Sequence, residues 1–192
     1  MKVAILGWGS LIWDKRDLPI VGDWQEGGPV LRIEFSRISS DGRLTLVIDE
    51  RNGVEAKTLY ARAESGDLNG AIASLRKREN NPPKERIGFV NLVGNSVREW
   101  SRAHHPIACG HIKEWAQKHN WGAVIWTGLI SNFAEKFGEP FSAPAAFRYF
   151  NGLTGETKAR ATEYIQNAPP EIDTPFRRLA LAAANPHREP AA

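Results

Sequence analysis

The 192-residue chain carries a net charge of +3, with 25 Lys and Arg residues scattered among 22 Asp and Glu residues. Because the basic residues form no stripe along the sequence, we expect no nucleic-acid partner. The composition is 42% hydrophobic, which is enough for a sizeable core. The single cysteine, Cys109, excludes an internal disulfide and is typical of a reducing compartment. No apolar stretch reaches the ~18 residues of a membrane helix or has the form of a secretory leader, so we expect a cytoplasmic protein without a membrane partner.

The first third of the chain predicts strands. Residues 14–29 are rich in Gly, Pro and charged residues and are typical of a loop. Four segments have the apolar or alternating pattern of strands: residues 3–6, 30–38, 44–48 and 57–61. Asp41-Gly42 and Asn52-Gly53 are favoured hairpin turns between the later strands. We therefore expect an antiparallel meander in which residues 44–48, which are nearly all apolar, form the central strand.

The rest of the chain predicts mainly helices. Asp67 is a typical N-cap for a helix that continues to Arg78, and Pro82 and Pro83 cannot continue that helix. Further helices are expected at residues 107–119, 142–150, 156–167 and 174–184, and strands at residues 87–92 and 122–127. Runs of strands followed by helices predict an α+β class. We expect a single domain over residues 1–185, followed by a disordered tail over residues 186–192.

A glycine-rich turn follows the first strand and consists of Gly7, Trp8, Gly9, Ser10 and Leu11, the 7–11 turn. Two glycines permit backbone angles that other residues avoid, and they leave N–H groups open to an anion or a carbonyl oxygen. An ordinary strand-ending turn explains the segment about equally well. Dinucleotide binding is disfavoured, because the third glycine of that fingerprint would fall at Ile12.

Four short motifs, in the same order, resemble the γ-glutamylcyclotransferase-like proteins, especially their ChaC branch. Residues 7–13, GWGSLIW, resemble the opening GYGSLIW of that branch, and residues 37–39 and 44–49 resemble its second and third strands. Residues 75–79, LRKRE, are similar to its LxxRE helix end, and residues 161–165, ATEYI, to its NTEYL helix. The resemblance implies a small mixed β-barrel with flanking helices, and it leaves residues 91–121 unmatched.

The resemblance also implies an activity, the cyclisation of a γ-glutamyl peptide or amine to 5-oxoproline, as in the metabolism of glutathione or γ-glutamyl amines. Glu79 falls on the family's catalytic glutamate, where a carboxylate would move the proton of the substrate's α-amine to the leaving amine. The 7–11 turn would bind the substrate through N–H groups, and Tyr164 would line the pocket, with no metal or cofactor. From the residues alone, Glu79 is more typical of a solvated helix face, and Tyr164 is equally well explained as core.

A different class of function stays open beside this one. A non-catalytic relative would bind a small acidic ligand or a protein partner in the same pocket, and Trp8, which replaces the family's tyrosine, favours that alternative. The sequence predicts neither the leaving group of the substrate nor the oligomeric state.

Other chemically reactive residues are weaker candidates. The possible metal ligands are His104, His105, Cys109 and His111, but Pro106 interrupts their helical spacing. A nucleophilic Cys109 is disfavoured by its apolar neighbours. A nucleophilic Ser10 is disfavoured because it lacks the Gly-x-Ser-x-Gly elbow.

Overall fold

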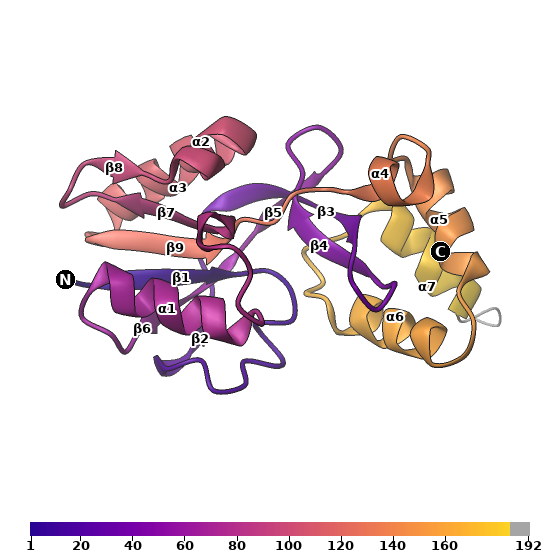
Figure 1. The fold of residues 1–192 in the computed structure, drawn as a ribbon, viewed down its shortest axis with the longest axis horizontal. Helices are drawn as coiled ribbons and strands as arrows, with labels where there is room; N and C mark the ends of the chain where they lie inside the picture. Colours follow the sequence, from indigo (N-terminus) through magenta and orange to yellow (C-terminus); the bar gives the residue numbers. More distant parts are fainter. Residues whose placement is uncertain (185–192) are drawn as a thin grey trace, which may run out of the picture.

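The computed structural model describes residues 1–184, which form an α+β fold with two open sheets and seven α-helices (Figure 1). In chain order the elements are β1 (Val3–Gly7), β2 (Ile20–Gln25), β3 (Val30–Ile38), β4 (Leu44–Ile48), β5 (Val54–Lys57), β6 (Leu59–Ala63), α1 (Leu68–Arg78), the 3-10 helix η1 (Lys84–Arg86), β7 (Ile87–Asn91), β8 (Ser96–Val97), α2 (Glu99–His104), α3 (Pro106–Lys118), β9 (Ala123–Thr127), α4 (Phe133–Phe137), α5 (Ala143–Gly152), α6 (Gly155–Asn167) and α7 (Pro175–Ala184). The larger sheet lies with α1, α2 and α3, and the smaller sheet lies with α4 to α7 (Figure 1).

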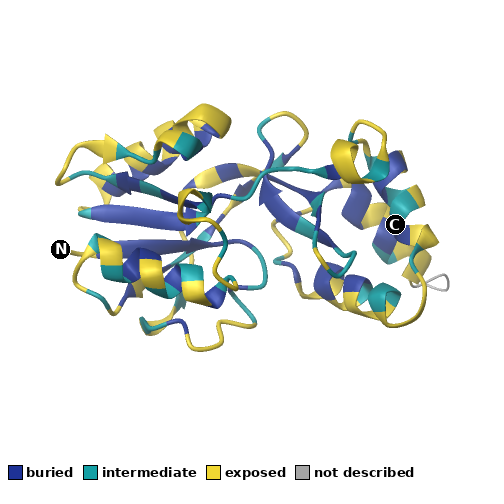
Figure 2. Ribbon diagram, viewed as in Figure 1, coloured by how far each residue is buried: buried dark blue, intermediate teal, exposed yellow. Residues whose placement is uncertain are grey.

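The larger sheet has the strand order β2-β6-β1-β9-β7-β8, in which β1 pairs parallel to β9 and antiparallel to β6. Its central strands are buried on both faces, as Figure 2 shows for β1 and β9. Because successive side chains of a strand point to opposite faces, Val3 and Ile5 pack with α1 while Ala4 and Leu6 pack with α3. The sheet is therefore a middle layer between helices.

The smaller sheet has the strand order β4-β3-β5, and α4 to α7 lie on its side of the molecule (Figure 1). Its core is aromatic: the ring centroids of Phe35 and Phe176 are 5.5 Å apart. The register of β3 against β4 shifts by one residue between Glu34 and Arg37, which is a β-bulge. As a result Phe35 and Ile38 both face the core. Arg37, which strict alternation would place on the core face, is turned away from it.

The expected meander and closed barrel are wrong. In the described residues β3, not β4, is the central strand of the smaller sheet, and the two sheets stay open. The expected strand at residues 57–61 is instead the end of β5 and the start of β6, which belong to different sheets. The chain changes sheet at the buried Thr58, whose N–H and hydroxyl both donate to the Pro29 carbonyl, at 3.2 and 2.8 Å.

The α+β class and the long helices are confirmed. The Asp67 carboxylate caps α1 by accepting from the Gly70 N–H, and the Ser142 hydroxyl caps α5 in the same way. Strand β2 lies inside the expected loop at residues 14–29 and is not predicted by the sequence pattern, and neither are the short elements β8, α2 and α4. The expected disordered tail lies outside the described residues. Across residues 1–184 no helix is both long and apolar enough to cross a membrane.

Candidate functional site

A cavity of about 590 Å³ opens where the ends of β1, β9 and α1 meet β3, β4 and α6. Six of the seven residues proposed from the sequence line it: Trp8, Gly9, Ser10, Leu11, Glu79 and Tyr164. Gly7 does not line it. An added Cβ at Gly7 would lie 2.8 Å from the Trp24 ring, so this glycine permits close packing inside the larger sheet. The volume is within the range of small-molecule sites.

Glu79 reaches the cavity because α1 ends in a Schellman motif. The Asn81 N–H donates to the Arg76 carbonyl at 2.8 Å, and the Asn80 N–H donates to the Lys77 carbonyl at 3.2 Å. Asn80 and Asn81 both adopt positive φ, 62° and 55°, a conformation that asparagine tolerates better than most residues. This motif ends the helix before the prolines and leaves Glu79 as its C-cap, facing the cavity.

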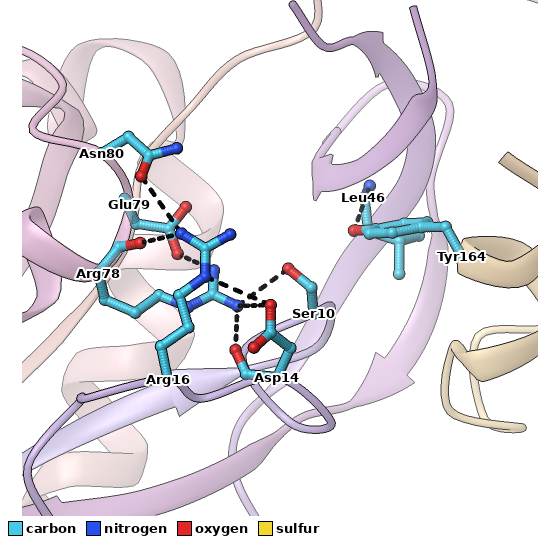
Figure 3. Close-up of polar contacts among 8 residues, drawn as sticks. All are labelled: Ser10, Asp14, Arg16, Leu46, Arg78, Glu79, Asn80 and Tyr164. Carbon is cyan, nitrogen blue, oxygen red and sulfur yellow. Dashed lines mark hydrogen bonds and ion pairs between the residues drawn. The ribbon is translucent and has the colours of Figure 1, made fainter. Parts of the chain in front are cut away.

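Arg78 connects Glu79 to the 7–11 turn (Figure 3). Its Nη1 lies 2.6 Å from Glu79 Oε1, and its Nη2 donates to Ser10 Oγ at 3.2 Å and to the Asp14 carbonyl. Only 6% of the Arg78 side chain is exposed, compared with 16% for Glu79. A guanidinium can hold several acceptors in a fixed plane, so Arg78 fixes the carboxylate relative to the turn.

Tyr164 faces this cluster from the other side of the cavity (Figure 3). Its hydroxyl accepts a hydrogen bond from the Leu46 N–H at 3.3 Å, and its ring packs edge-on against Trp13. Burial raises the pKa of Tyr164 to about 12, and the negative charge of Glu79 acts in the same direction. At neutral pH the Tyr164 hydroxyl therefore keeps its proton, which it can donate to a ligand.

The 7–11 turn, which lines the cavity except at Gly7, has free backbone donors. Among the described residues, the N–H groups of Gly9, Ser10 and Leu11 donate to no protein acceptor, while the Gly9 and Ser10 carbonyls accept from Ile12 and Asp14. The expected positive φ is wrong, since neither Gly7 nor Gly9 adopts one. Gly9 is instead required by close approach, because an added Cβ would lie 2.9 Å from Tyr164 Oη.

The cavity has an excess of positive side chains that the sequence pattern does not predict. Five arginines line it, against two carboxylates: Arg16, Arg37, Arg43, Arg78 and Arg160, with Asp41 and Glu79. Arg37 and Arg43 come from the β3–β4 hairpin and the other three from separate segments. Each has an acidic residue within three positions in the sequence, so no linear pattern marks them. A small molecule with more than one anionic group matches this lining.

The weaker candidates from the sequence lie elsewhere. Cys109 lies on the buried face of α3, where burial raises the pKa of its thiol to about 11 and keeps it protonated. His105 is also buried, and burial lowers its pKa to about 4. Within residues 1–184 no three His, Cys, Asp or Glu side chains are grouped as a metal site would require.

A second cavity, of about 660 Å³, lies between the β5–β6 junction and α3. Its charged groups are of both signs: Lys57 and Lys118, with Glu26, Glu114 and Glu171. Of the residues named from the sequence, only His111, a weaker candidate, lines it. Its mixture of positive and negative side chains does not favour a ligand of one charge. The smaller, arginine-lined cavity is therefore the better candidate site.

Comparisons with protein-family models, with curated proteins and with solved structures find no match to this chain.

Proposed function

We propose that this protein is a γ-glutamylcyclotransferase-type enzyme, which converts a γ-glutamyl peptide or amine to 5-oxoproline and a free amine. The observation that carries the proposal is the convergence of three distant segments on one cavity: the 7–11 turn, Glu79 and Tyr164. Each of these segments belongs to one of the short motifs that resemble the family. Convergence of unrelated surface or core residues on one cavity would be a coincidence, whereas a shared substrate site requires it.

The proposed reaction needs a substrate held in a bent conformer. The α-amine nitrogen attacks the γ-carbonyl carbon, so a carbon–nitrogen bond forms as the five-membered ring closes. The bond from that carbon to the leaving nitrogen then breaks, and no water is consumed. Because the attack is intramolecular, much of the catalysis consists of holding the reacting atoms in the correct orientation.

Glu79 is the proposed proton carrier. Its carboxylate takes a proton from the substrate's α-ammonium group, which makes the amine nucleophilic, and then gives a proton to the leaving nitrogen. The free N–H groups of the 7–11 turn are suited to the oxyanion that develops on the γ-carbonyl oxygen. Arg78 orients the Glu79 carboxylate, and the protonated Tyr164 hydroxyl supplies a further donor in the cavity.

One observation favours a second candidate, a non-catalytic protein that binds a small anionic ligand. The cavity has five arginines, and Trp8 lines it where the resembling family has a phenolic hydroxyl. A binding protein of this kind needs the positive charge but not a proton carrier.

The deciding experiment incubates the purified protein with a panel of γ-glutamyl dipeptides, glutathione and γ-glutamyl amines. Mass spectrometry then quantifies 5-oxoproline, free glutamate and the released amine. We expect equal amounts of 5-oxoproline and amine from at least one compound. Release of glutamate instead would indicate hydrolysis, and binding in calorimetry without any product would favour the non-catalytic alternative. Either result would reject the cyclotransferase proposal.

A further inference from the structure

Arg37 enters the cavity because of the β-bulge in β3. Leu31 and Ile33, before the bulge, and Phe35, within it, all face the core. Without the extra residue, Arg37 would continue this series into an aromatic core. The shift in register instead pairs Arg37 with Thr45 of β4, and both residues line the cavity. Bulges often redirect a side chain beside a functional site.

Arg37 differs from the other four arginines of the cavity in its charge balance. The other four each have a carboxylate partner within 4.0 Å: Arg16 with Asp14, Arg43 with Asp41, Arg78 with Glu79 and Arg160 with Glu156. In the described part of the chain Arg37 has no such partner. Its Nη1 donates to the uncharged Ile130 carbonyl at 2.9 Å.

The surroundings of Arg37 increase this imbalance. Burial and the nearby Arg86 guanidinium lower the pKa of Arg37, although Glu135 acts in the opposite direction. A half-buried cation beside a second cation is costly unless an anion is bound nearby. The site therefore has positive charge that the protein itself leaves uncompensated.

Thr127 supplies a second, independent observation in the same cavity. It is the last residue of β9 and begins the segment that leads to Ile130, the carbonyl partner of Arg37. Thr127 lines the cavity, and its buried hydroxyl has no hydrogen-bond partner among the described residues. Buried hydroxyls are usually paired, so this one is available to a ligand.

We propose that Arg37 and Thr127 form a second anion subsite that binds a carboxylate on the leaving group. This inference rests on the proposed function. The 7–11 turn binds the γ-glutamyl part, and the Arg37 subsite selects what is attached to it. The substrate class is then a γ-glutamyl amino acid or peptide, whose leaving amine carries its own carboxylate, rather than a simple γ-glutamyl amine.

Two compounds that differ only in that carboxylate, γ-glutamylalanine and γ-glutamylethylamine, test the proposal. We expect wild-type kcat/KM to favour γ-glutamylalanine by about 10–100-fold, the range for a charge-assisted pair. Arg37→Gln should reduce this preference about tenfold or more, and Arg37→Lys should reduce it less. Thr127→Val, which removes the hydroxyl at nearly constant size, should reduce it by a smaller factor.

The matched control is Arg32→Gln. Arg32 is exposed on the same strand, outside the cavity, and like Arg37 it donates to a backbone carbonyl, that of Gly53 at 3.0 Å. This control should keep the wild-type preference. An equal preference in wild type and in both Arg37→Gln and Thr127→Val would overturn the subsite, as would a wild type that does not discriminate between the two compounds.

Failure of the subsite and failure of the proposed function are separable. Calorimetry in the Glu79→Gln background measures dissociation constants for the two compounds without turnover. If wild type forms no 5-oxoproline, the enzyme proposal fails. The subsite is then tested by the ratio of the two dissociation constants, γ-glutamylethylamine over γ-glutamylalanine, which Arg37→Gln should lower if the subsite exists and leave unchanged if it does not. If wild type turns over both compounds equally, the subsite fails and the enzyme proposal stands.

Discussion

Arg78 Nη1 lies 2.6 Å from Glu79 Oε1, so two consecutive residues at the end of α1 form an ion pair beside the cavity. Neighbouring residues on a regular helix point in directions about 100° apart and do not normally face each other. Here they can pair because Glu79 has left helical geometry as the C-cap of the Schellman motif. The arrangement of the helix end therefore positions the proposed proton carrier.

Arg78→Lys should separate this positioning from charge. Lysine keeps the positive charge, but it lacks the planar fork in which Nη1 contacts Glu79 while Nη2 contacts Ser10 and the Asp14 carbonyl. We expect the free energy of unfolding, measured by urea denaturation, to fall by about 1–3 kcal/mol, since charged hydrogen bonds are lost at a buried site. We expect kcat to fall about tenfold or more. Arg62→Lys on the exposed face of β6 is the control, and equal stability of the two variants would contradict the bridging role of Arg78.

Glu79→Gln tests the proton carrier directly. Glutamine is nearly isosteric and still offers an oxygen to Arg78, but it cannot accept a proton near neutral pH. We expect turnover to fall by about 10²–10⁴-fold, while the dissociation constant of the substrate changes far less. The free energy of unfolding should fall by about 1 kcal/mol, because the contact with Arg78 loses one of its two charges, and relief of the unfavourable helix-dipole interaction offsets part of that loss. Rates of 5-oxoproline release and calorimetry provide the measurements.

The control for this variant is Glu85→Gln, at an exposed glutamate of η1 outside the site cavity. It should retain wild-type turnover and affinity. If wild type is active and Glu79→Gln is equally active, another group carries the proton. The proposed mechanism would then be rejected even though the cavity remains the candidate site.

Gly9→Ala should disturb Tyr164 rather than the turn itself. An added Cβ would lie 2.9 Å from Tyr164 Oη, closer than such contacts allow, and Gly9 has no positive φ that alanine would strain. We expect Gly9→Ala to weaken substrate binding about tenfold. In a Tyr164→Phe background the same substitution should cost much less, because the clashing oxygen is absent. A double-mutant cycle on ligand affinity measures this coupling, and strictly additive effects would contradict the contact.

Local signals in the sequence predict most of the regular elements. Asp67 and Ser142 cap their helices as expected, and the alternation of residues 30–38 correctly predicts β3. Strand pairing could not be predicted in the same way. The parallel pairing of β1 with β9 joins residues far apart in sequence, and the change of sheet at Thr58 leaves no gap in the strand pattern. Both depend on packing across the whole chain.

The candidate site likewise has residues that local motifs predict and residues that only long-range packing explains. Short motifs predict Glu79, Tyr164 and the 7–11 turn, and the structure brings all but Gly7 to one cavity. Arg37 could not have been predicted, because strict alternation places it on the core face of β3 and only the bulge reverses it. The expected positive φ of Gly9 is also wrong, and its close contact with Tyr164 could not be predicted from a local pattern, because the two residues are far apart in the sequence.

Two buried titratable groups, Glu34 and His105, predict opposite pH dependences of stability. Burial raises the pKa of Glu34 from 4.5 to about 7, although its carboxylate accepts from the Phe35 N–H at 2.8 Å. Burial lowers the pKa of His105 from 6.5 to about 4. Asp49 acts on both groups and raises the pKa of each, so it adds to the first shift and opposes the second.

The signs follow from proton binding. For Glu34 the folded pKa is the higher one, so its contribution is fully present below pH 4.5 and is lost as the pH rises towards 7. For His105 the folded pKa is the lower one, so its contribution is present above pH 6.5 and is lost as the pH falls towards 4. Between about pH 4.5 and 6.5 the two effects change the free energy of unfolding in opposite directions, so their sum varies little with pH in wild type.

Glu34→Gln should therefore make the protein more sensitive to acid. Glutamine keeps an acceptor for the Phe35 N–H but does not titrate, so only the His105 effect remains of this pair. We expect the difference in unfolding free energy, variant minus wild type, to increase with pH between about 4.5 and 7 and then level off, by an amount of order a few kcal/mol. Urea denaturation at half-unit pH steps measures this difference, and groups that titrate equally in both proteins cancel. Glu55→Gln, at an exposed glutamate of β5, should give a flat difference curve. A flat curve for Glu34→Gln as well would show that Glu34 does not titrate differently in the folded and unfolded states.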